Sequence, residues 1–187
     1  MVMHYQKSDP IVLGSGELYL AKVSEIVDPE QLTEEEVNKL VNIGAIESGA
    51  NIDIADEDIE IESDNRGTVM KITADKDINF SSGVMTWVLE NIANFLMGAT
   101  YTEEKADEVV TSKKLVVGLN DQKPNVYLRF VHEKTSGGTI TLNMYNAIFA
   151  GKLNLNFEKK KQTTVDYNFM ALANDNKNYI EIIETFE

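Results

Sequence analysis

One stretch decides the fold: residues 51–80 read NIDIADEDIEIESDNRGTVMKITADKDINF. From residue 45 onward, apolar side chains recur at every second position, which is the period of a β-strand. Ile52 and Ile54 have the opposite parity from Ile59 and Ile61, so the acidic triplet at 56–58 marks a bulge, a bend or a small turn. The composition of residues 64–67, DNRG, predicts a turn. Residues 45–80 are therefore predicted to form a long, acidic β-hairpin.

The first strand of this hairpin is acidic without interruption, because no Lys or Arg occurs between residues 51 and 65. Three interpretations stay open. The carboxylates are a solvated hairpin face, or they hold Ca²⁺, or they form a negative surface with an electrostatic role. The calcium interpretation lacks the ligand spacing, the central glycine and the closing glutamate of an EF-hand loop. The residues concerned are Asp53, Asp56, Glu57, Asp58, Glu60, Glu62 and Asp64.

A helix is predicted directly after the hairpin, at about residues 82–97. Ser81 and Ser82 offer N-caps, and Gly98 stands where a glycine commonly follows the last turn. Apolar residues recur at helical spacing, so one stripe of this helix should be buried along a sheet. The stripe consists of Met85, Val88, Leu89, Ile92, Phe95 and Leu96.

The rest of the chain predicts further strands and one short helix. The acidic turn at 33–36 favours a helix start, and we expect a short helix near 33–42. Alternation predicts strands at 11–22, 126–130, 140–144, 153–157, 165–171 and 179–186. The predicted fold is mainly β, a β-sandwich or barrel with one central flanking helix.

Composition and motifs argue against an enzyme. The formal charge is −14, which disfavours a surface that binds nucleic acid. The chain has no cysteine, no known catalytic or phosphate-binding motif and no stretch suited to spanning a membrane, so we expect a soluble protein without catalytic residues, metal or cofactor. His132 and Glu133 are neighbours in a predicted strand, so their side chains point to opposite faces and do not converge on a substrate.

Two segments resemble the tail tube proteins, or major tail proteins, of long-tailed bacteriophages. Residues 43–52, IGAIESGANI, open the acidic hairpin, and residues 80–98, FSSGVMTWVLENIANFLMG, lead from it through the predicted helix to a glycine. The order and spacing of these segments match that family over nearly the full chain. The β-rich second half matches in kind, without a sharp motif.

The resemblance implies a single tail-tube domain over residues 1–187 and a structural role in the virion. Copies would form rings, usually of six, which stack into a hollow tail tube through which DNA passes without specific binding. Assembly would take place in the host cytoplasm. Other implied partners are a tape-measure protein, a tail terminator and baseplate or tip proteins, and no membrane is involved.

Two hypotheses extend this picture. The acidic hairpin is expected to present some of its seven carboxylates to the bore, so that a polyanion slides instead of sticking. Residues 1–10 and 24–44 are expected to order only when rings stack, because their apolar residues lack an evident internal partner. The alternatives are a tail terminator or completion ring protein of the same fold, and a monomeric β-sandwich module that binds a ligand.

Overall fold

A computed structural model describes residues 16–84, 88–119, 122–135, 137–151, 153 and 165–186. Strands dominate these residues, as the sequence predicted. The elements are β1 (Glu17–Lys22), a 3-10 turn (Val23–Glu25), α1 (Glu34–Val37), β2 (Val41–Ser63), β3 (Gly67–Val84), α2 (Leu89–Phe95), β4 (Ala99–Ala106), β5 (Val109–Val117), β6 (Asn125–Glu133), β7 (Thr139–Phe149), β8 (Val165–Ala171) and β9 (Ile180–Glu184). The strand expected at 153–157 lies outside the described residues except for Leu153.

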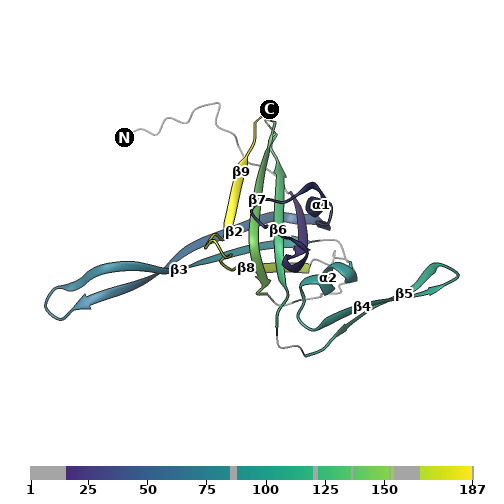
Figure 1. Cartoon of the computed structure of the whole chain (residues 1–187), viewed down its shortest axis with the longest axis horizontal. Helices are drawn as coiled ribbons and strands as arrows, with labels where there is room; N and C mark the ends of the chain where they lie inside the picture. Colours follow the sequence, from purple (N-terminus) through teal and green to yellow (C-terminus); the bar gives the residue numbers. More distant parts are fainter. Residues whose placement is uncertain are drawn as a thin grey trace.

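Antiparallel strands form a closed barrel at the centre of the molecule (Figure 1). The strand order is β6-β1-β2-β3-β8-β7, and β6 also pairs with β7, so the sheet returns to its first strand. β9 pairs with β7 along residues 140–144, next to the site where β8 pairs with residues 147–149. Closure removes most of the free strand edges that an open sheet exposes.

The barrel core follows the alternation of the sequence. On β8, Val165, Tyr167, Phe169 and Ala171 are all buried, as the period of two predicts. α2 contributes Ile92 and Phe95 to the same core. The Phe95 ring lies 5.0 Å from the rings of Phe149 and Tyr167 and 5.6 Å from that of Phe169, measured between centroids. α2 therefore attaches to both β7 and β8.

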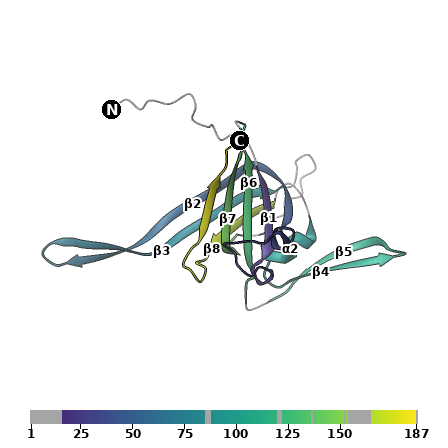
Figure 2. The ribbon, with the colours of Figure 1, turned by 45° about the horizontal axis from the view of Figure 1, so that its top comes forward.

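Two long ribbons leave the barrel on opposite sides (Figures 1 and 2). The outer part of β2 and β3 forms the first, and its strands are joined by the turn at 64–66 with Gly67 at a φ of 70°. β4 and β5 form the second as a separate two-stranded sheet. The predicted acidic hairpin and its turn are thus confirmed, whereas the second ribbon was not predicted from the sequence.

The two helices are shorter than predicted. β3 continues through Ser81 and Ser82 to Val84, so these serines pair in a sheet and do not cap a helix. α2 begins only at Leu89, after Val88, whose side chain makes no capping hydrogen bond. The prediction of a helix over 82–97 was therefore wrong in its extent, because the serine signal was outweighed by pairing with β2 and β8.

Residues 23–40 pack on the outside of the barrel through a second small core. Ile26 joins Ala21, Tyr127 and Tyr145 there, with Leu32 and Leu40 at its margin. The α1 start is fixed by a capping box, in which Thr33 and Glu36 accept hydrogen bonds reciprocally. The expectation that the apolar residues of 24–44 lack an internal partner was wrong for those that pack against the two tyrosines of this small core. Val27, Val37 and Val41 are exposed. Residues 1–10 lie outside the described part.

Candidate assembly surfaces

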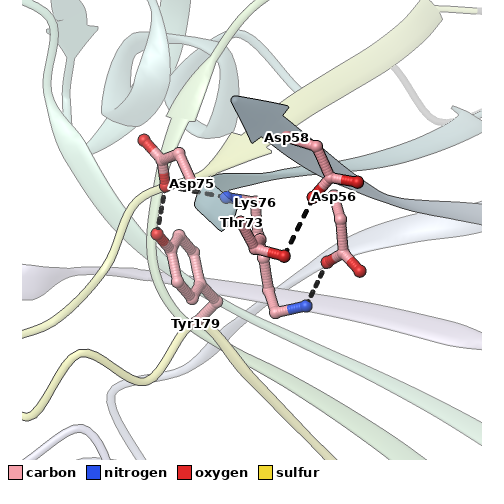
Figure 3. A network of polar contacts seen from close by, with 6 residues as sticks. All are labelled: Asp56, Asp58, Thr73, Asp75, Lys76 and Tyr179. Carbon is pink, nitrogen blue, oxygen red and sulfur yellow. Dashed lines mark hydrogen bonds and ion pairs between the residues drawn. The ribbon is translucent and has the colours of Figure 1, made fainter. Parts of the chain in front are cut away.

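The β2–β3 ribbon has two chemically different faces, and its register assigns each residue to one of them. Directly opposed residues of antiparallel strands share a face. Asp56 faces Lys76, Asp58 faces Thr73 and Glu60 faces Lys71 on what we term the ladder face. Asp56 is ion-paired with Lys76, and the Thr73 hydroxyl donates to Asp58 at 2.9 Å (Figure 3). Lys71 Nζ lies 2.6 Å from Glu60. Lysines of β3 therefore neutralise two of the ladder-face carboxylates, Asp56 and Glu60, across the strands.

The other face of the same ribbon keeps its negative charge near the barrel. We term it the acidic face. Asp53 lies opposite Asn79, and Ala55 lies opposite Asp77. Among the described residues of β2, β3 and β8, no Lys or Arg shares this face, so its charge is not compensated locally. Its carboxylates are Asp53, Glu57, Asp75, Asp77 and, on the neighbouring β8, Asp166.

One contact ties the root of the ribbon to the barrel. The hydroxyl of Tyr179, in the loop before β9, donates to Asp75 (Figure 3). This hydrogen bond holds the pKa of Asp75 below its ordinary value, and the backbone N–H of Lys76 acts in the same direction. The same contact raises the pKa of Tyr179. Asp75 therefore stays charged while it anchors the ribbon.

Farther out, the acidic face becomes apolar. Ile59 lies opposite Ile72 and Ile61 lies opposite Met70, and each side chain is between 44% and 57% exposed. We call these four residues the tip patch. The change of face between Ile54 and Ile59, predicted from their parity, accompanies a register shift between Glu57 and Asp58. No described residue outside the ribbon covers the tip patch.

The β4–β5 ribbon also exposes apolar side chains. It turns at Asp107 and Glu108, which adopt φ values of 51° and 66° and form a two-residue loop of the primed type. Val109 is 66% exposed, and Val116 and Val117 are exposed as well. An isolated two-stranded ribbon is marginally stable in water. Both ribbons thus present apolar surface that a partner can bury.

The structure divides the seven carboxylates singled out in the sequence. Asp53 and Glu57 lie on the acidic face, whereas Asp56, Asp58, Glu60 and Glu62 lie on the ladder face and Asp64 lies in the turn. Of the predicted helical stripe, Ile92 and Phe95 are buried, and Val88, Leu89 and Leu96 are half-buried. Met85 lies outside the described residues. His132 is buried and Glu133 exposed, so the two side chains diverge as predicted.

Three carboxylates of the acidic face were missed by sequence reasoning. Asp75, Asp77 and Asp166 lie on β3 and β8, whereas the acidic run was recognised on β2 alone. Their common face depends on strand register, which an alternating pattern does not specify between strands. The second ribbon was missed because its valines stand in adjacent pairs, although its β-branched content was a usable signal.

Among the described residues, no group of three or more His, Cys, Asp or Glu is placed to hold a metal ion. No helix in the same part of the chain is long and apolar enough to cross a membrane.

The fold, but not the sequence, has counterparts among known proteins. No protein-family model matches the chain, and no curated protein matches it. A chain of the PVC sheath–tube complex, an extracellular contractile injection system in the extended state, aligns over 96% of this chain and 95% of its own length, with a TM-score of 0.53 and 12% identity. The tube-terminating cap of the anti-feeding prophage aligns over 96% and 98%, with a TM-score of 0.43 and 13% identity, a similarity too low to support an argument. At 12% identity, the first comparison shows that the chain shares the fold of a subunit of a sheath–tube complex.

Proposed function

We propose that this protein is a non-enzymatic structural subunit whose copies form rings that stack into a hollow tube. The observation that carries the proposal is the pair of ribbons that leave a closed barrel with their apolar faces uncovered. Exposed apolar surface of this kind marks sites of protein association. The shared fold with a subunit of a sheath–tube complex supports the same conclusion.

The opposite directions of the ribbons favour a ring over a symmetric dimer. When two different surfaces of one chain meet, the contact is head-to-tail, and it closes into a ring if the rotation between copies permits. The resemblance to phage tail tube proteins leads us to propose six copies in each ring. By the same resemblance, the protein belongs to a phage tail, forms one tail-tube domain over 1–187, and meets tape-measure, terminator and baseplate or tip proteins.

We further propose that DNA passes through the bore and that the acidic face lines it. A surface with uncompensated carboxylates does not bind phosphates, and repulsion reaches about 8 Å at physiological salt, so the carboxylates must lie close to the passing strand. Asp53 and Asp77 suit this role better than Asp56 and Glu60, which are paired with lysines. Of the seven acids singled out in the sequence, Asp53 and Glu57 lie on the acidic face, and only Asp56 and Glu60 are neutralised by lysines.

Negative-stain electron microscopy of the purified protein over a concentration series tests assembly. We expect rings or hollow tubes of uniform width. Single rings that never stack would favour an end-ring protein, such as a terminator, over the tube itself. A monomer that persists at high concentration, also in the presence of an assembled tail tip, would refute the proposed function.

The role of the acidic face is tested on assembled tubes. Asp53→Lys with Asp77→Lys reverses two uncompensated charges, and Asp58→Lys with Glu62→Lys reverses two on the ladder face of the same ribbon. We expect short DNA fragments to co-sediment with tubes of the first variant and much less with those of the second. Equal DNA retention by both variants would show that the acidic face does not line the bore.

A further inference from the structure

Two isoleucines lie on the core-facing side of the sheet and are nevertheless exposed. Ile54 lies opposite Ile78, which is buried, and Ile182 lies opposite Leu142, which is also buried. Because directly opposed residues of antiparallel strands share a face, both isoleucines belong by register to the side that forms the core. Their side chains are 53% and 56% exposed. The described residues therefore leave part of the core side open to solvent.

Both isoleucines lie where β9 and the β2–β3 ribbon diverge (Figure 1). A cavity of about 350 Å³ occupies this corner, and Ile54, Ile78 and Ile180 line it. Ile182 follows Ile180 by two residues on the same face of β9, so it extends the apolar surface along that strand. We term Ile54, Ile180 and Ile182 the corner patch.

The first described residue of the chain lies on the same side of the sheet. A Cβ on Gly16 would lie 2.6 Å from two carbons of the Phe130 ring, so the backbone of Gly16 rests directly on that ring. The Phe130 ring lies 5.9 Å from that of Phe80, which shares a face with the root of the ribbon. Phe130 also stands in one row across the sheet with Leu142 and Ile182. The residues before Gly16 are therefore tethered beside the corner patch.

The distance from this tether selects a particular segment. β1, β6, β7 and β9 are neighbours in that order, so three strand spacings, or about 14 Å at most, separate β1 from β9. An extended chain covers this distance in about four or five residues. Counting back from Gly16 leads to residues 11–13, Ile-Val-Leu, which are uncharged and lie between Pro10 and Gly14.

From this placement we propose that residues 11–13 dock on the corner patch of their own chain and cover the open part of the core. A tethered segment has an effective concentration in the millimolar range, so it outcompetes a second copy at micromolar protein concentration. Lys76 and Lys177 also line the cavity, but both are exposed and keep their charges in water. The docked segment braces the root of the ribbon together with the contact between Tyr179 and Asp75. This inference does not depend on assembly into rings or tubes.

Disulfide formation tests the contact in the full chain, which has no cysteine of its own. The variant with Ile11→Cys and Ile182→Cys is diluted until it is monomeric and treated with a mild oxidant. We expect a disulfide within one chain, seen as a monomer band that migrates faster on a denaturing gel and returns to normal after reduction. In the control, Ile11→Cys is combined with Ile61→Cys, whose thiol lies on the tip patch beyond the reach of residue 11. We expect little disulfide there.

Each other result would overturn the proposal. A disulfide-linked dimer of the first variant would show that a second copy covers the corner patch. Equal yields from the two variants would show that residue 11 has no fixed position, and no disulfide in either would place it elsewhere.

Urea unfolding of the diluted protein gives an independent measurement without cysteines. Ile11→Ser with Leu13→Ser removes two apolar side chains from the contact, and we expect the midpoint to fall by roughly 1 M. Val2→Ser with Met3→Ser is the matched control near the start of the sequence, and we expect no shift. An unchanged midpoint in the first variant, or equal shifts in both, would contradict the docking of residues 11–13. The proposed function would stand in either case, because neither measurement involves assembly.

Discussion

Replacement of Phe95 by alanine should destabilise the barrel more than any change on its surface. The side chain is 1% exposed, and its ring contacts three aromatic rings on β7 and β8. Truncation of a buried phenylalanine costs about 3–5 kcal/mol, and we expect the upper part of this range because three ring contacts are lost together. The change also removes the anchor of α2, which leads directly into the β4–β5 ribbon.

Urea unfolding followed by far-UV circular dichroism measures this effect. With a slope of about 2 kcal/mol per molar urea, a loss of about 4 kcal/mol lowers the midpoint by about 2 M. Leu119→Ala is the control, since that side chain is 95% exposed and its loss should stay within about 0.5 kcal/mol. A loss below about 1.5 kcal/mol for Phe95→Ala would refute the view that α2 is fixed by this aromatic cluster.

Three further changes test local features. Backbone N–H groups and a hydroxyl donate to Glu36 and lower its pKa from 4.5 to about 2, so the stability that this carboxylate contributes is present above pH 4.5 and is lost as the pH falls toward 2. The Glu36→Gln variant should show a flatter dependence of stability on pH over that window in acid titrations, and an unchanged profile would contradict this. Gly138→Ala should lower the free energy of unfolding by about 2 kcal/mol or more in the same urea assay, because φ is 79° at this residue and a Cβ would lie 2.2 Å from the Thr185 carbonyl oxygen. An unchanged stability would mean that this turn rearranges freely. Glu108→Gly should relieve about 1 kcal/mol of strain at a positive φ and slow hydrogen exchange in β4 and β5 about fivefold, whereas faster exchange would show that the turn is not strained.

Much of the fold could be predicted because it depends on alternation within single strands. The buried residues of β8 and the turn at 64–67 follow from period and composition alone. The break in parity between Ile54 and Ile59 likewise located the register shift to within a residue. These features are local, so a single sequence is enough to specify them.

The errors arose where pairing between strands outweighed local signals. Ser81 and Ser82 are good caps in isolation, but backbone pairing on both edges of β3 extends the strand through them. The composition of the acidic face was not predicted for a related reason. Asp75 and Asp166 share a face with Glu57 only through the registers of β3 with its two neighbouring strands. The assignment of a residue to a face was predictable within a strand, whereas the composition of that face was not.

The division of the β2–β3 ribbon into two faces bears directly on how one segment can serve two roles. Were all its carboxylates uncompensated, burying one side against a neighbour would require desolvating several charges, which is costly. The lysines of the ladder face neutralise Asp56 and Glu60 within the chain. The tip patch presents apolar side chains over two opposed residue pairs. The carboxylates of the acidic face lie near the barrel, where Tyr179 fixes the root of the ribbon through Asp75. A twisted ribbon with this distribution can associate through its tip while its root stays negatively charged and hydrated, so association and electrostatic repulsion do not compete for the same residues.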